Sequence, residues 1–331
     1  MKVAILGAAH QHVDYALTEV DRREDLDLVA ACEPDPDLRA RFLGDLEAPL
    51  YATAAELLEA HDVDVALVAG IYSERAAAAV AALGAGAHVL ADKPLCTSLD
   101  QLEQVRRAAA SAGRHVSLVF EKRFYAPTLA LRRLLADGVL GTIAMIASTG
   151  PHTLNQSSRP AWFLDPATYG GIAGDLPIHD IDLTLDLVAA QGGEPTGTVS
   201  AFTGNADPAA HPGFDDHVAL LLHAGGVPAT IEASWLGPQA SDVHGHYRMR
   251  VTGSRGTAEI DWAFDRLTVT THDRPTWDEP LPTAPRPAQF FFDALLAGDE
   301  PEITTAASLR ATEVALKAQR SAGHGGASER F

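Results

Sequence analysis

The chain has few cysteines, few lysines and no long hydrophobic run. Its two cysteines, Cys32 and Cys96, do not form a metal-ligand spacing, and we expect both to be reduced, packed thiols. No apolar stretch reaches the ~18 residues of a membrane span, and the apolar stretch after Met1 is too short for a secretory signal. These absences exclude a membrane-spanning protein, and we expect a cytoplasmic one.

Positive charge is also scarce. The 331 residues include 25 lysines and arginines against 44 acidic residues, which gives a formal net charge of −19 at pH 7. Such a surface repels nucleic-acid phosphates and anionic lipids, so we expect neither a nucleic acid nor a membrane surface as partner. A hydrophobic content of 47% is typical of a globular protein, and the length predicts about two domains.

The order of the expected elements predicts two different domains. Up to residue 121, short apolar strands alternate with helices, which is typical of a doubly wound parallel sheet in an α/β fold. From residue 122 to 331, helices and a long loop are followed by strands in series, which predicts an α+β domain with a large, mostly antiparallel open sheet. Two helices at 287–297 and 305–321 close the chain, and we expect weak order at 273–287 and 322–331. The expected strands are at 3–6, 26–32, 63–69, 88–91, 116–120, 142–149, 197–203, 216–223, 228–234, 246–252, 257–261 and 265–271.

The turn after the first expected strand is a candidate dinucleotide site. Glycines at such a turn let the backbone approach a pyrophosphate at a helix N-terminus, although Gly7 is the only glycine of a G-x-G-x-x-G pattern here. Glu33 ends the second expected strand, where a carboxylate accepts hydrogen bonds from ribose hydroxyls and repels a 2′-phosphate. We therefore expect NAD rather than NADP, the alternative being a strand–helix turn that binds no nucleotide. The turn residues assigned to the cofactor are Gly7, Ala8, Ala9, His10, Gln11 and His12.

A second candidate lies at the tip of a later strand, in Asp92-Lys93-Pro94. A lysine at the carboxyl end of a parallel strand faces the crevice in which α/β sheets bind ligands. Proline after it favours an extended Lys93 and ends the strand. The alternative is an ordinary solvated lysine.

A third candidate is the segment around Asp175, His179 and Asp182. On one helix these residues share a face, and a carboxylate next to an imidazole suits a general base. Pro177 fits only the first helical turn, so we expect Asp175 at the N-cap or N-terminus of a helix that runs to about residue 190. The alternative is a capping Asp175 with a buried structural His179.

These segments resemble the Gfo/Idh/MocA family of oxidoreductases. Asp92-Lys93-Pro94 is similar to its Glu-Lys-Pro motif, and residues 175–182 are similar to its D-x-x-x-H-x-x-D helix. Shorter similarities are Lys122–Pro127, Trp162–Asp165, Gly253–Thr257 and the pattern over 290–322. The resemblance implies an N-terminal NAD(P)-binding Rossmann domain over 1–121 and a C-terminal domain over 122–331 that binds substrate and often builds dimers or tetramers through its open sheet.

The resemblance also implies roles for particular residues. Lys93, Asp175 and His179 match the catalytic residues. His179 would take a hydroxyl proton while hydride leaves for nicotinamide, Lys93 would hydrogen-bond the same oxygen, and Asp175 would orient substrate or imidazole. In place of the family's Thr-Pro-Asn turn the chain has Ala69-Gly70-Ile71, where Gly70 leaves room for a close approach. The further residues assigned to the cofactor are Ala69, Gly70, Ile71, Asp92 and Lys93, and those assigned to substrate are Lys93, Arg123, His152, Trp162, Asp175 and His179.

The function predicted in this way is an NAD-dependent dehydrogenase that acts on a ring hydroxyl, or the matching carbonyl, of a sugar, inositol or related polyol. One alternative is a dinucleotide-sensing regulator without catalysis, favoured by the reduced glycine turn. Another is a metal-dependent lyase or hydrolase with His10 and His12 as ligands, completed by Asp182 or His179. For Arg123 a structural ion pair is the alternative role, and for Trp162 a place in the core. We expect no metal, a small-molecule substrate and a homodimer or homotetramer.

Overall fold

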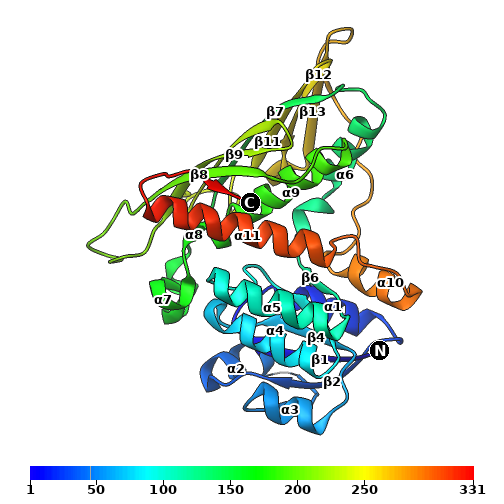
Figure 1. Cartoon of the computed structure of the whole chain (residues 1–331), viewed down its shortest axis with the longest axis vertical. Coiled ribbons are helices and arrows are strands. Elements are labelled where there is room, and N and C mark those ends of the chain that lie inside the picture. The colour runs from blue at the N-terminus through cyan, green and yellow to red at the C-terminus, as the bar shows by residue number, and fades with distance from the viewer. Residues whose placement is uncertain (45) are drawn as a thin grey trace. The chain divides into compact units, whose positions relative to one another are not determined.

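A computed structural model describes residues 1–44 and 46–331 and divides the chain into two compact units (Figure 1). Unit 1 comprises residues 1–120, 167–170 and 286–312, and unit 2 comprises residues 121–166, 171–285 and 313–331. The expected boundary after residue 121 therefore lies beside the first change of unit. The return of two later segments to unit 1 was not expected from the sequence.

Unit 1 is built on a six-stranded parallel sheet with the strand order β3-β2-β1-β4-β5-β6. The order reverses between β1 and β4, which is the doubly wound topology expected from the alternating pattern. Its elements are β1 Lys2–Ala8, α1 Val13–Arg22, β2 Asp27–Cys32, α2 Pro36–Leu43, β3 Leu50–Tyr51, α3 Ala54–Ala60, β4 Val65–Ala69, η1 Tyr72–Glu74, α4 Arg75–Gly84, β5 His88–Ala91, α5 Leu99–Ala112, β6 Val116–Leu118 and α10 Gln289–Ala297.

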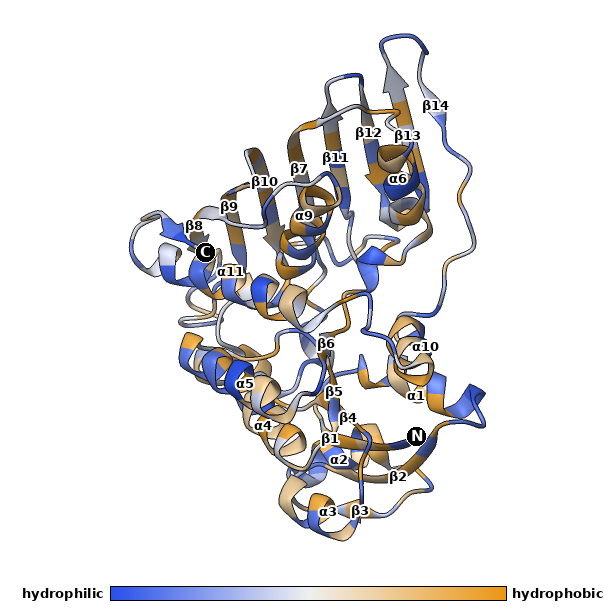
Figure 2. Ribbon diagram, turned by 45° about the vertical axis from the view of Figure 1, so that its right-hand side comes forward, coloured by the Kyte–Doolittle hydropathy of each residue, from blue (hydrophilic) through white to orange (hydrophobic). Residues whose placement is uncertain are grey.

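Helices cover both faces of this sheet, which explains why the central strands are apolar without alternation. Val3, Ile5 and Leu67 project to one face and pack with α1 and with Phe291 and Phe292 of α10, both fully buried. Helix α10 carries mostly hydrophobic residues (Figure 2). The intervening strand residues face the other side, where α4 packs on β4 and β5 and lies beside α5 (Figure 1).

The outer strand β6 is bonded to a segment from far along the chain. The amide of Val116 donates to Thr305 Oγ1 at 3.0 Å, and the amide of Leu118 donates to Ser308 Oγ at 3.1 Å. Ser117 Oγ donates to the carbonyl of Ile303 at 2.8 Å. Side chains and backbone of residues 303–308 thus occupy an edge that would otherwise present unpaired groups.

Unit 2 is built on a nine-stranded sheet with the order β14-β13-β12-β11-β7-β10-β9-β8-β15. All neighbours are antiparallel except β7 and β10, which run parallel at the centre. Alternate residues of β9 and β10 are buried, because helices such as α9 cover only one face of these strands. The mostly antiparallel open sheet is therefore as expected. Its strands are β7 Ile143–Pro151, β8 Gly197–Gly204, β9 His217–Ala224, β10 Val227–Ser234, β11 Arg248–Gly253, β12 Gly256–Asp261, β13 Arg266–Thr271, β14 Trp277–Asp278 and β15 Glu329–Arg330.

The second half of the chain differs from the expectation in two respects. The helix expected over 175–190 is divided into α8, which ends at Asp175, and α9, which begins after Pro177. The segments 273–287 and 322–331 contain β14 and β15, which pair with β13 and β8. The last helix is α11 Thr305–Gly323, close to the expected 305–321. The remaining helical elements are η2 Glu121–Arg123, α6 Ala126–Ala136, η3 Gln156–Ser158, η4 Ala161–Leu164, α7 Pro166–Tyr169, α8 Ile172–Asp175, α9 Ile178–Ala190 and η5 Trp262–Phe264.

In the described part of the chain, every helix is too short or too polar to cross a lipid bilayer.

Candidate active site

The first part of the site is a contact between two glycines at the carboxyl ends of β1 and β4. Gly7 has φ +84°, and a Cβ built on it would lie 2.7 Å from the Cα of Gly70. The amide of Ala9 donates to the carbonyl of Ala69 at 2.8 Å, which holds the two strand ends together. Gly70 was expected to leave room for the cofactor, and in the structure the segment that approaches it is the turn at Gly7.

Glu33 lies beside this glycine pair and is fixed by backbone amides. Its carboxylate accepts hydrogen bonds from Ala8 at 2.7 Å and from Asp35 at 3.0 Å. Burial raises the pKa of Glu33, whereas these two amides act in the opposite direction. Arg39 Nη1 donates to the carbonyl oxygen of Glu33 at 3.2 Å, which places a positive charge near this strand end. Arg39 is not among the residues that the sequence pattern predicts at this site.

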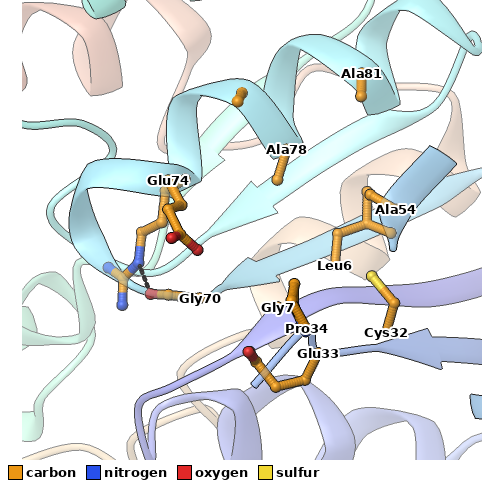
Figure 3. A pocket seen from close by; sticks show the side chains of 12 residues that line it. Leu6, Gly7, Cys32, Glu33, Pro34, Ala54, Gly70, Glu74, Ala78 and Ala81 are labelled. Carbon is orange, nitrogen blue, oxygen red and sulfur yellow. Dashed lines mark hydrogen bonds between the residues drawn. The ribbon is translucent and has the colours of Figure 1, made fainter. Parts of the chain in front are cut away.

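A largely apolar pocket of about 220 Å³ adjoins Glu33. Figure 3 shows Ala54, Ala78 and Ala81 along its apolar side, and Gly7 and Glu33 at its polar end. These features fit the adenosine half of a dinucleotide, because a flat base needs apolar walls and its ribose needs a carboxylate acceptor. The residues present therefore fit NAD.

His10 and His12 converge on Asp92 at the tip of the same sheet. His10 Nδ1 lies 3.0 Å from Asp92 Oδ2, and His12 Nδ1 lies 2.8 Å from Asp92 Oδ1. Arg75, itself fully buried, donates to Asp92 Oδ2 at 2.9 Å and to the carbonyl of Gly70 at 2.7 Å. Burial would raise the pKa of Asp92, but His12, Arg75 and His10 hold it well below its usual range. Burial, followed by the charge of His12, lowers the pKa of His10 to about 4.

This cluster has three potential metal ligands, since the relevant atoms of His10, His12 and Asp92 lie within 4.8 Å of one another. Their contacts, however, have the length of hydrogen bonds, and Arg75 already supplies a positive charge to the carboxylate. The arrangement is that of a hydrogen-bonded network that holds the turn to β5. Asp92, assigned to the cofactor from the sequence, anchors the two histidines and Arg75.

The second candidate, Lys93, follows the end of β5 and is 5% exposed. Strand β5 ends at Ala91, two residues before the lysine, as the motif predicts. The peptide bond from Lys93 to Pro94 is cis.

The third candidate, in unit 2, is only partly as expected. Asp175 is the last residue of α8 and His179 lies in the first turn of α9, and they are 1% and 5% exposed. The N-cap of α9 is Pro177, without a capping side chain, so the prediction that Asp175 caps this helix is wrong. Leu176 and Pro177 keep helical backbone angles, which leaves Asp175 one turn before His179.

Asp182 does not belong with this pair. It accepts two hydrogen bonds of 2.6 Å from Arg123, whose third nitrogen donates to Asp186 at 2.8 Å. Burial raises the pKa of Asp182 to about 6, and Arg123 opposes that shift. Arg123 is 4% exposed, so the structure gives it the alternative role, a structural ion pair, instead of the substrate contact assigned from the sequence.

The structure adds a residue that the sequence analysis missed. Glu121 Oε1 lies 3.6 Å from His179 Nε2. The only signal in the sequence is that Glu121 begins a run of three charged residues directly after an apolar strand. That pattern is usually a solvated surface, and nothing in it specifies a partner 58 positions away.

The other two residues assigned to substrate, His152 and Trp162, lie in the segment that follows β7. His152 Nδ1 donates to the carbonyl of Gly150 at 2.8 Å, and the ring packs 4.4 Å from the ring of Tyr247. This bond leaves Nε2 as the acceptor of a neutral imidazole. Trp162 is half-buried, with its ring edge-on to Phe163 at 5.7 Å.

Comparisons with known proteins agree with this description. Residues 1–120 match the model of the "Oxidoreductase family, NAD-binding Rossmann fold", and residues 128–259 match that of the "GFO/IDH/MocA C-terminal domain". The trans-1,2-dihydrobenzene-1,2-diol dehydrogenase of Bos taurus is 27% identical over 268 residues, which cover 80% of this chain and 74% of that protein. Inositol 2-dehydrogenase 3 of Saccharopolyspora erythraea is 27% identical over 190 residues, 55% of this chain and 53% of that one.

The fold is shared with solved structures. An inositol dehydrogenase homolog from Azotobacter vinelandii, complexed with NAD⁺, superposes with a TM-score of 0.81 over 100% of this chain and 97% of that chain, at 20% identity. The predicted resemblance, fold class and cofactor are thus confirmed. The chain belongs to the Gfo/Idh/MocA family of NAD-binding oxidoreductases.

Proposed function

We propose that this oxidoreductase transfers a hydride between NAD and a ring hydroxyl, or the matching carbonyl, of a small cyclic diol, inositol or sugar. The relatives support a ring substrate, because they are named dehydrogenases of a dihydrobenzene diol and of inositol. The observation that carries the proposal is the glycine contact between Gly7 and Gly70 with the Glu33 carboxylate beside it.

In this proposal NAD is held by the turn from Gly7 to His12, by Glu33 and by residues 69–71. Asp92 acts indirectly, since it fixes His10 and His12. NAD when bound supplies the hydride acceptor. Arg39 beside Glu33 is the residue that would tolerate a 2′-phosphate if the carboxylate were absent.

The chemical roles fall to Lys93, Asp175 and His179. His179 accepts the hydroxyl proton on its imidazole as hydride leaves the carbinol carbon, and Lys93 donates a hydrogen bond to the same oxygen. Asp175, one helical turn before His179, orients substrate or imidazole. His152 and Trp162 are the proposed contacts to the rest of the ring, and Arg123 is left out because it is bound to Asp182 and Asp186.

The test is a substrate screen with NAD over inositols, aldoses, uronates, amino sugars and cyclic dihydrodiols. With a substrate found, Lys93→Met and His179→Ala should lower kcat by about 10²–10⁴ while NADH affinity stays near native. Lys2→Met, which removes an exposed lysine paired with Asp62, is the matched control and should leave kcat unchanged. Unchanged turnover in His179→Ala would refute its role as base. NADH binding without turnover of any compound would favour a dinucleotide-sensing regulator.

We also propose a cytoplasmic homodimer or homotetramer built through the unit 2 sheet. Phe202 on β8 and Leu221 on β9 project from the sheet and are 63% and 52% exposed. Exposed apolar side chains on neighbouring strands favour burial against a second copy. Phe202→Glu with Leu221→Glu should lower the mass measured by light scattering, whereas an unchanged mass would place the interface elsewhere.

A further inference from the structure

Three consecutive charged residues, Glu121, Lys122 and Arg123, lie along the start of helix α9. Lys122 Nζ donates to both carboxylate oxygens of Asp180, at 3.2 and 3.0 Å. Arg123 forms its paired bonds with Asp182. Every one of these side chains is buried, so the two ion pairs hold η2 against α9 in one register.

The two ion pairs fix the position of η2 on α9, and with it the surroundings of Glu121. Lys122 is opposite Asp180 and Arg123 is opposite Asp182, and with η2 held in this way the preceding residue, Glu121, lies close to His179. The Glu121 Oε1 to His179 Nε2 distance is 3.6 Å, with the two residues 7% and 5% exposed. An imidazole and a carboxylate at this distance and burial interact strongly, because water screens them little.

Of the other charged or titratable groups around His179, two carboxylates are paired with cations and one phenol is neutral, and Asp175 is a further buried carboxylate. Asp180 and Asp182 are neutralised by Lys122 and Arg123. Asp175 lies one turn earlier on the chain. Burial raises the pKa of Tyr247, and the negative charge of Glu121 raises it further, so that phenol stays neutral and Glu121 acts on both groups.

We propose that Glu121 is the positioning residue of His179: its carboxylate orients the imidazole through Nε2 and makes it a stronger base. An opposite charge within about 4–6 Å shifts a pKa by about 1–3 units, so removing the charge of Glu121 should lower the pKa of His179 by that amount. The consequence for catalysis rests on the proposed function, in which His179 is the base. The physical coupling between the two side chains does not.

The test is an NMR titration of the full-length protein labelled at histidine, with the His179 signal assigned by its absence in His179→Asn. Glu121→Gln keeps the shape and removes the charge, and it should lower the pKa of His179 by about 1–3 units. Glu121→Asp keeps the charge but withdraws it by one methylene, and it should give a smaller fall. Glu259→Gln removes a carboxylate paired with Arg250 on the surface of unit 2, and it should leave His179 unchanged.

An unchanged pKa of His179 in Glu121→Gln would overturn the proposal. If Glu121→Gln does not fold, the decision passes to Glu121→Asp, where an unchanged pKa has the same meaning. With a substrate in hand, the acidic limb of kcat against pH should move in Glu121→Gln by the same amount as the NMR value. If the pKa of His179 shifts in Glu121→Gln but the protein turns over no substrate, the proposed function is refuted and the coupling of Glu121 to His179 stands. If the protein turns over a substrate but the pKa of His179 does not shift, the coupling is refuted and the proposed function stands.

Discussion

Replacing Gly7 by alanine tests the contact on which the cofactor turn depends. Gly7 has φ +84°, where an alanine costs about 1–2 kcal/mol relative to glycine. The new Cβ would also lie 2.7 Å from the Cα of Gly70. Because that Cα is a backbone atom, the overlap can be relieved only by moving β1 or β4. Overpacking of this kind typically costs about 1–3 kcal/mol, so the free energy of unfolding should fall by about 2–5 kcal/mol in total.

Two other glycines of unit 1 separate these contributions. Gly113 has φ +61° with no atom within 4 Å of its added Cβ, so Gly113→Ala should show the backbone cost alone, about 1–2 kcal/mol. Gly84 ends α4 in open space without a positive φ, and Gly84→Ala should be neutral or stabilise by up to about 1 kcal/mol. Gly7→Ala should be the most harmful of the three.

Urea unfolding of these variants can be followed separately in the two units. All four tryptophans, Trp162, Trp235, Trp262 and Trp277, belong to unit 2, so their emission reports that unit, whereas far-ultraviolet circular dichroism reports both. Gly7→Ala should lower the midpoint of the dichroism transition and weaken NADH binding, with tryptophan emission in buffer unchanged. A loss no greater than that of Gly113→Ala would show that the glycine contact carries no energetic weight.

Other outcomes concern the cofactor, pH and metal. NADH should bind more tightly than NADPH. Glu33→Ala should narrow this difference in affinity, because Arg39 can then pair with the 2′-phosphate of NADPH without repulsion from the Glu33 carboxylate. Equal affinities for the two cofactors in the unmodified protein at low salt would contradict the expectation. Burial, followed by Arg114, lowers the pKa of His88 to about 4, so the folded state binds the proton less tightly than the unfolded state. Stability from this group is present above about pH 6.5 and is lost as pH falls towards 4, and His88→Gln should flatten that dependence in urea midpoints. Treatment with a chelator should leave NADH affinity unchanged, because Arg75 already neutralises Asp92; stoichiometric metal whose removal abolishes binding would refute this.

The strands of unit 1 other than β3, and their doubly wound parallel arrangement, could be predicted because each of these strands is a short apolar run bounded by turn residues. The two-residue strands β14 and β15 could not, since their pairing depends on neighbours brought by the tertiary fold. The break between α8 and α9 follows from Pro177, whose ring fixes φ and removes an amide donor. The pattern placed that proline in a first turn but did not show that a separate helix precedes it.

Within the candidate site, the sequence predicted which residues lie at the ends of the strands, but it did not predict which distant side chains contact the site residues. Gly7, Glu33 and Lys93 follow directly from the ends of parallel strands, where ligands bind in such sheets. The spacing of Asp182 from His179 suggested that the two side chains share one face of a helix. In the structure the Asp182 carboxylate is instead hydrogen-bonded to Arg123, 59 positions away in the sequence. Glu121 was missed for the same reason, because an ion pair between distant segments leaves no periodic trace in the sequence.

The long separation between β6 and residues 303–308 has a consequence for protein synthesis. A nascent chain that has reached residue 120 contains all six strands of the parallel sheet, but Phe291, Phe292 and the partners of β6 are still unmade. The nucleotide-binding half, although translated first, can be completed only after the whole of the second sheet up to β14 has left the ribosome. Until then its apolar face and outer strand are exposed to chaperones and to other chains, and a gene fragment ending at residue 121 would keep that exposure permanently.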